Sequence, residues 1–184
     1  MTIVISPIGD LGFDDTFLAR VGSEIQNTFG FPYRVLPLLE EEDLVPDPTR
    51  GQVHSTPVLE KLAALLPARD AKILAITRVD LFIPILTHVY GEAQLGGKAC
   101  IISTHRLGEG ISVASSRKTY QCRIIKEAIH ELGHTFNLRH CPDRTCIMHY
   151  CRSIMDVDRK LNRLCRYCKI LLEDEIKRQE RTED

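Results

Sequence analysis

Two histidines and a glutamate stand at a spacing that suits metal-assisted hydrolysis. His130 and His134 are four residues apart in a stretch with helical periodicity, so both imidazoles project from one helical face. Such a pair can supply two ligands to one Zn²⁺, and Glu131 lies beside them as a candidate general base. The alternative is that both histidines are ordinary helix-surface residues and that Glu131 is solvated.

A third histidine, His140, follows His134 by six residues. On a continued helix His140 would point about 240° away from His134, so a shared metal requires a sharp turn between them. Asn137 lies in this interval, and Asn is the commonest non-Gly residue in the left-handed conformation. The sequence therefore predicts a zinc site formed by three histidines, with Asn137 supporting the turn.

Five of the seven cysteines fall between residues 141 and 168. Four of them form two pairs, and four thiolates from two separated pairs are typical of a closed structural zinc site. The predicted ligands are Cys141, Cys146, Cys165 and Cys168. Cys151 competes for one ligand position, and a redox dithiol at Cys165 and Cys168 is the functional alternative.

The motif region resembles the archaemetzincins, which are metzincin-clan zinc metallopeptidases with a second zinc bound by four cysteines. The resemblance rests on His130-Glu131-x-x-His134-x-x-Asn137-x-x-His140-Cys141-x4-Cys146-x-Met148 and on Cys165-x-x-Cys168. The family motif has Gly where this chain has Asn137.

The resemblance implies a role for each matching residue. His130, His134 and His140 would bind the catalytic zinc, and Glu131 would be the general base. Met148 would be the methionine of the Met-turn beneath the zinc. The four cysteines would bind a structural zinc, giving two Zn²⁺ per chain. Tyr150 lies at an offset where some other metzincins have a retractable zinc ligand, although we expect a packed aromatic there.

Strand and helix patterns alternate along the first two thirds of the chain. Strands are expected at residues 2–7, 33–39, 72–80, 88–94 and 98–103, and helices at residues 17–29, 57–66, 119–138 and 156–177. Thr56 is expected to cap the second helix, and residues 40–56 before it read as a loop.

This order predicts an α/β fold with a twisted, mostly parallel sheet and backing helices. Residues 88–94 would form an antiparallel edge strand, which the resemblance places along the cleft, where a peptide could bind by β-augmentation. We expect an upper lobe, residues 1–137, with the sheet and the active-site helix. A small zinc-braced lower lobe, residues 138–184, would hold the third histidine, the Met-turn and the four-cysteine site.

The composition excludes several other classes of protein. With 24 basic and 25 acidic residues the net charge is −1, which argues against a charge-driven nucleic-acid binder. The longest apolar run, residues 81–86, is too short to span a membrane, and no export segment is recognisable. We therefore expect a cytoplasmic monomer with a peptide or protein substrate, and neither a membrane nor a nucleic acid as partner.

The sequence thus predicts a zinc metallopeptidase. The alternative is a zinc-stabilised binding module for protein or nucleic acid without peptidase activity. Its basic surface would comprise Arg152, Arg159, Lys160, Arg163 and Arg166. Glu131 favours the peptidase, because a binding module needs no carboxylate beside the two helical histidines.

Overall fold

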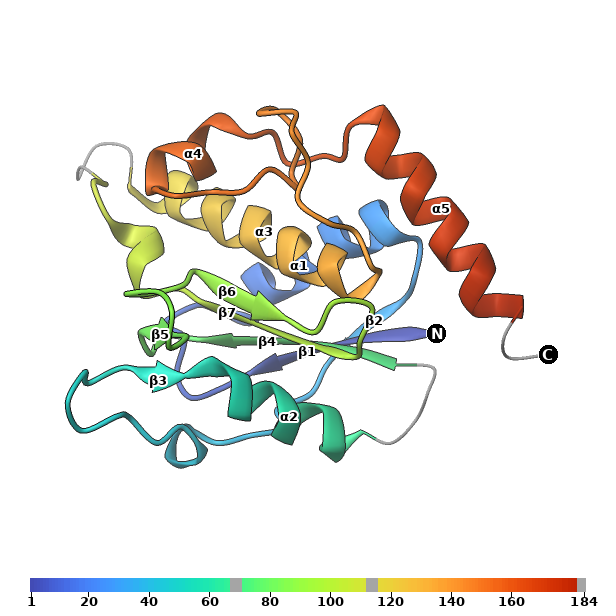
Figure 1. Ribbon diagram of the computed structural model, residues 1–184. Helices are drawn as coiled ribbons and strands as arrows, with labels where there is room; N and C mark the ends of the chain where they lie inside the picture. Colours follow the sequence, from blue (N-terminus) through green and yellow to red (C-terminus); the bar gives the residue numbers. More distant parts are fainter. Residues whose placement is uncertain (67–70, 112–115, 182–184) are drawn as a thin grey trace.

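The strands of the protein form a five-stranded sheet in a computed structural model that describes residues 1–66, 71–111 and 116–181 (Figure 1). The strands are β1 (Thr2–Pro7), β2 (Tyr33–Val35), β4 (Ala71–Thr77), β6 (Gly91–Ala93) and β7 (Ala99–Ser103). Their order is β2-β1-β4-β7-β6. All neighbours are parallel except β6, which runs antiparallel to β7 at the edge. The predicted α/β fold and its antiparallel edge strand are therefore confirmed.

Helices bury both faces of this sheet. Helices α1 (Asp15–Phe29) and α3 (Ser116–Thr135) cover one face, and α2 (Ser55–Leu65) covers the other (Figure 1). Alternate residues of β4 enter two separate cores: Leu74 packs with the first pair of helices, and Ile73 packs with α2. A strand buried on both sides is continuously apolar, which explains why β4 was recognisable in the sequence.

Helix α1 follows its predicted pattern. Its apolar positions Phe17, Val21, Ile25 and Phe29 are all buried. The Asp14 carboxylate accepts a hydrogen bond from the Phe17 amide at the first turn, and Gly30 ends the helix at φ 80°.

Strands β2 and β6 are much shorter than the sequence predicts, and β4 ends at Thr77 and not at residue 80. Strand β2 ends at Val35; Leu36 still donates to the Ile5 carbonyl, but Pro37 has no N–H with which to continue the ladder. Strand β6 covers only Gly91–Ala93, because Val89 pairs with Leu81 instead.

The expected loop at residues 40–56 contains regular structure that was not predicted. It includes a 3₁₀ helix, Glu41–Asp43, and strand β3 (Val53–His54). Strand β3 pairs with β5 (Leu81–Phe82) in a second, two-stranded sheet. These strands are too short to leave a periodic pattern in the sequence.

The predicted cap of α2 is wrong. The helix begins at Ser55, so Thr56 lies inside its first turn. The hydroxyls of Ser55 and Thr56 both donate to the carboxylate of Glu92 on β6. These side chains therefore tie α2 to the edge strand.

The single helix predicted at residues 156–177 is also wrong. The chain forms two helices, α4 (Ile154–Arg159) and α5 (Arg166–Arg181). Between them Leu161 donates to the Thr145 carbonyl, and Arg163 accepts from Ile147. The extended connection brings the Cys165 amide to 3.3 Å from Cys146 Sγ, so the requirements of the cysteine cluster override the helical pattern.

Among the helices in the described residues, none combines the length and apolarity needed to cross a bilayer.

Candidate active site

The catalytic candidates lie at the C-terminal end of α3, where the chain turns sharply. The helix ends at Thr135, three residues earlier than predicted, and Asn137 adopts φ 60°. Asn137 is the one non-Gly residue at positive φ in the described part of the chain. The Asn137 amide donates to the His134 carbonyl, and the Leu138 amide donates to the Gly133 carbonyl. The left-handed turn expected at Asn137 is thus confirmed.

The Asn137 side chain has a partner that the sequence did not indicate. It donates a hydrogen bond to the carboxylate of Glu175 on α5, which lowers the pKa of that carboxyl together with the bonds from Arg178 and Gln179, against the opposing effect of burial. A Gly at this position could not make this bond. Helix α5 is therefore connected directly to the turn that precedes His140.

The turn brings three histidines together. The candidate ligand atoms of His130, His134 and His140 all lie within 4.8 Å of one another. His130 Nδ1 lies 2.8 Å from the Ile147 carbonyl oxygen, and His134 Nδ1 lies 2.7 Å from that of Leu138. Each Nδ1–H can only donate to its carbonyl, which leaves the Nε2 lone pairs free for a metal.

The distance between two of these nitrogens fits zinc. His130 Nε2 and His134 Nε2 are 3.2 Å apart. Two nitrogens that ligate one tetrahedral Zn²⁺ at about 2.0–2.1 Å should be about 3.3 Å apart. In neutral imidazoles that donate through Nδ1, both Nε2 atoms are acceptors, and a cation between them would satisfy both lone pairs.

Burial also keeps the histidines in the form that binds metal. It lowers the pKa of His130 well below its ordinary value and lowers that of His134 to about 4. The more exposed His140 also has a lowered pKa, with burial again the largest cause. The imidazoles are therefore neutral at physiological pH.

Glu131 lies in the same cavity as the histidines and is almost fully buried, with 6% of its surface exposed. Burial raises its pKa well above the ordinary value, the neighbouring Glu127 adds to this rise, and the Lys160 ammonium opposes it. Gly91 on β6 packs directly against the Glu131 side chain. A Cβ atom at Gly91 would lie 2.6 Å from Glu131 Cγ and 2.8 Å from the Ile101 carbonyl oxygen.

A buried ion pair lies one helical turn before Glu131. Lys160 Nζ, at the end of α4, is 2.7 Å from Glu127 Oε1, and the two side chains are 0% and 3% exposed. Burial opposes the charge on Lys160, but Glu127 raises the pKa of Lys160 above its ordinary value. From the sequence alone, Lys160 is expected to be part of a basic surface. In the structure its side chain is fully buried and paired with Glu127 of α3.

Met148 is fully buried beside the active-site helix. A Cβ atom at Gly133 would lie 2.5 Å from Met148 Sδ, so the absence of a side chain at Gly133 lets the methionine approach the helix between His130 and His134. The carbonyl of the preceding Ile147 accepts the His130 hydrogen bond. Met148 therefore packs against α3 at Gly133, next to His134.

The four predicted cysteines form a second cluster. The sulfur atoms of Cys141, Cys146, Cys165 and Cys168 lie within 4.8 Å of one another. Cys141 Sγ and Cys165 Sγ are 3.8 Å apart, the distance of about 3.8 Å expected for sulfurs at about 2.3 Å from a tetrahedral Zn²⁺. The Cys168 amide donates to Cys165 Sγ. This arrangement fits a closed zinc site, and Cys151 is not part of it.

The histidines line a cleft with a volume of about 670 Å³. Residues of α3 form its floor. We call the side formed by the lining residues between 83 and 95 the strand wall. The opposite side, the C-terminal wall, comprises Arg139, His140, Tyr150, Cys151 and Arg152. The Tyr150 ring packs edge-on against that of His140, with 4.9 Å between the centroids.

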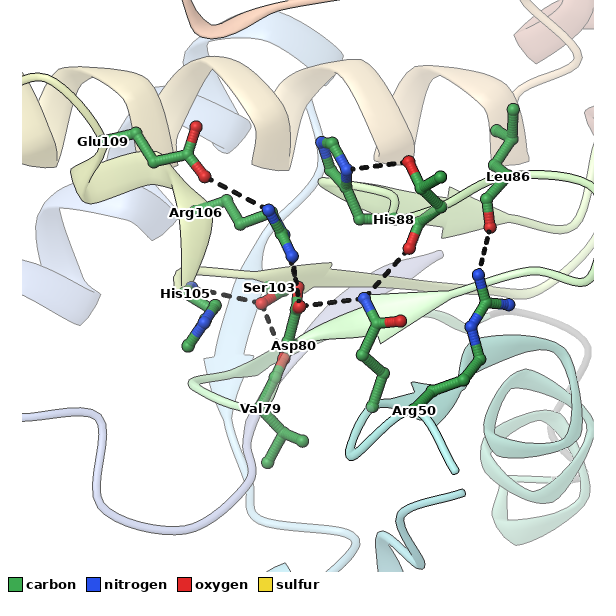
Figure 2. A network of polar contacts seen from close by, with 11 residues as sticks. Arg50, Val79, Asp80, Leu86, His88, Ser103, His105, Arg106 and Glu109 are labelled. Carbon is green, nitrogen blue, oxygen red and sulfur yellow. Dashed lines mark hydrogen bonds and ion pairs between the residues drawn. The ribbon is translucent and has the colours of Figure 1, made fainter. Parts of the chain in front are cut away.

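Hydrogen bonds hold the loop between β5 and β6 that forms much of the strand wall (Figure 2). Arg50 donates to the Leu86 carbonyl, and Gln52 donates to the Thr87 carbonyl and to Asp80. Arg106 binds Asp80 through two hydrogen bonds of 2.7 and 2.8 Å. Although burial raises it, the pKa of Asp80 is held below its ordinary value by these donors.

Comparison with known proteins extends the similarity beyond the motif. The profile of Peptidase family M54 matches residues 26–174. The archaemetzincin of Methanocaldococcus jannaschii is 35% identical over 175 residues, which are 95% of this chain and 94% of that protein. The crystal structure of the archaemetzincin from Methanopyrus kandleri matches with a TM-score of 0.81 at 30% identity and covers 96% of each chain. The structure of a zinc-dependent peptidase from Methanocorpusculum labreanum matches with a TM-score of 0.77 at 28% identity, over 91% of this chain and 99% of that one.

Proposed function

The chain belongs to peptidase family M54, the archaemetzincin zinc metallopeptidases, and on this basis we propose the catalytic and structural roles of its residues. His130, His134 and His140 hold the catalytic zinc, and Glu131 is the general base. The observation that carries the proposal is the convergence of three histidine side chains and one buried carboxylate in a single cleft.

When bound, Zn²⁺ supplies Lewis-acid chemistry that polarises a carbonyl and acidifies water. Glu131 accepts the proton of the attacking water and later delivers it to the leaving amine. Burial raises the pKa of Glu131 in the metal-free chain, so the site tolerates a carboxyl group that holds a proton between the two transfers. Gly91 keeps the carboxylate in position by leaving room for its side chain.

The peptide substrate lies along β6 in this proposal. Strand β6 is an edge of the sheet, and all three of its residues line the cleft, so its outer backbone groups face the space a peptide would occupy. An extended substrate can add to this edge as a further strand.

We further propose that each chain binds two zinc ions, with Cys141, Cys146, Cys165 and Cys168 holding the structural one. Met148 and Asn137 support the catalytic site from below and from the turn. The division into an upper lobe, residues 1–137, and a lower lobe, residues 138–184, is part of the same proposal; residues 182–184 lie outside the described residues.

A monomeric state and a reducing compartment such as the cytoplasm are also proposals, and the cluster of zinc-suited thiols supports the compartment. The binding-module alternative is not favoured. Lys160 is not part of a basic surface, because its side chain is buried in the ion pair with Glu127. Arg159 also has an acidic neighbour, since its guanidinium lies 3.7 Å from the Asp156 carboxylate.

The proposal is tested by peptide-library cleavage with wild type and Glu131→Gln, with zinc counted by elemental analysis. The variant should keep its zinc and lose about 10²–10⁴-fold in turnover, since it loses only the proton transfers. Glu60→Gln, at an exposed position on α2, is the matched control and should behave as wild type. Unchanged turnover in Glu131→Gln would assign the activity to other residues.

A further inference from the structure

Two arginines on the C-terminal wall have no acidic partner. Arg139 and Arg152 both line the cleft and are exposed, and no carboxylate contacts either guanidinium within the residues that the structure describes. An arginine stays charged at any physiological pH, so the C-terminal wall carries two free positive charges.

The carboxylates that line the same cleft do not neutralise these charges. Glu127 is paired with Lys160, and Glu131 lies on the floor beneath Gly91. Glu92 is part of the strand wall, but its carboxylate is directed to α2, where its two oxygens accept hydrogen bonds from the hydroxyls of Ser55 and Thr56. In the described part of the chain, no lining carboxylate is therefore paired with either arginine of the C-terminal wall.

The two arginines come from opposite ends of a pair of neighbouring segments. Cys141 and His149 form a parallel bridge, and the Cys141 amide donates to the Met148 carbonyl. Arg139 precedes Cys141 by two residues, and Arg152 follows His149 by three. Counted from this bridge, Arg139 and Arg152 lie on opposite sides of it along the chain, which favours two separate binding positions on the C-terminal wall.

We propose, building on the proposed peptidase function, that Arg139 and Arg152 select peptides with acidic side chains at two separate positions. Guanidinium groups bind carboxylates through two parallel hydrogen bonds. Successive side chains of an extended peptide point to opposite sides, so only alternate substrate positions can face the C-terminal wall.

The test is a set of fluorogenic peptides in which Glu replaces Gln at one position at a time. Wild type should cleave the Glu peptide about two- to fivefold better at two positions, the range of exposed ion pairs, and this preference should fall with added NaCl. Arg139→Gln should abolish the preference at one position and Arg152→Gln at the other. Arg34→Gln, on β2 at the far edge of the sheet, is the matched control and should keep both.

A binding measurement separates this inference from the peptidase proposal. Fluorescence anisotropy with zinc-loaded Glu131→Gln should show tighter binding of the preferred Glu peptide than of its Gln counterpart, and adding both arginine substitutions should remove the difference. Such binding without any cleavage by wild type would refute the peptidase proposal and leave acidic selectivity standing. Equal handling of Glu and Gln peptides in both assays, or a preference that survives Arg139→Gln with Arg152→Gln, would overturn the inference.

Discussion

Gly91→Ala should damage catalysis while leaving both metal clusters intact. A Cβ atom at residue 91 would lie 2.6 Å from Glu131 Cγ, 2.9 Å from Glu131 Cδ and 2.8 Å from the Ile101 carbonyl oxygen. The Ile101 carbonyl is backbone of the neighbouring strand β7 and cannot move away easily. The new methyl group must therefore displace the Glu131 side chain, or the edge strand must separate from β7.

The size of the effect follows from these distances. Ordinary contact begins at 3.4 Å, so Glu131 Cγ must retreat by about 0.8 Å. A misplacement of about 1 Å in a reacting group can cost about 10²-fold in rate. We therefore expect kcat/KM to fall about 10²-fold, mainly through kcat because Glu131 acts in the proton transfers.

The assay is steady-state cleavage of a fluorogenic peptide, together with zinc content and thermal unfolding. Gly108→Ala is the control, because a Cβ atom at Gly108 meets only Tyr120 at 3.8 Å. That variant should keep wild-type activity. Wild-type kcat/KM in a folded Gly91→Ala protein would refute the argument, because it would mean that the position of Glu131 does not limit the reaction.

Three further predictions concern metal coupling, the buried ion pair and pH. Three-histidine-site affinity for zinc should fall about 10–100-fold in Cys168→Ser, as measured by competitive zinc titration, because the cysteine cluster includes Cys141, the residue next to His140. Unchanged affinity would show that packing alone positions His140. Lys160→Met should lower the free energy of unfolding, measured in urea, by about 3–5 kcal/mol, because it leaves Glu127 buried and unpaired. Adding Glu127→Gln should recover most of this loss. An equal loss of stability in the single and the double variant would contradict this reasoning. After chelation of zinc, the free energy of unfolding should fall as the pH drops from 6.5 toward about 4. The cause is that the pKa of His134 is lower in the folded chain, so the unfolded chain binds more protons in this range. Urea titrations that give the same free energy of unfolding across this pH window would refute the prediction.

Features with a local cause could be predicted from the sequence. The histidine spacing on α3 follows from helical geometry, and the left-handed turn at Asn137 follows from the need to bring His140 back. The continuously apolar strands β4 and β7 were recognisable because both of their faces are buried. The four cysteines were predicted as a cluster because their type and pairing are distinctive.

Features that depend on distant partners could not be predicted. Lys160 reads as one charge in a basic run until α4 brings it to Glu127. Thr56 resembles a helix cap in the sequence, but Glu92 on a later strand accepts hydrogen bonds from the hydroxyls of both Thr56 and Ser55. The break between α4 and α5 replaces a good helical stripe, because pairing with the segment around Cys146 outweighs helix propensity there.

The two walls of the cleft differ in what can disturb them. The strand wall is held by hydrogen bonds and by the Asp80–Arg106 ion pair, none of which involves a sulfur atom. The C-terminal wall depends on thiols such as Cys141 and Cys165, which lie 3.8 Å apart. An oxidant such as peroxide that joined these two would draw them to about 2.05 Å. His140, next to Cys141, would move with them. Such a bond would therefore disturb the cleft at His140, whereas the contacts that hold the strand wall contain no group that it could alter.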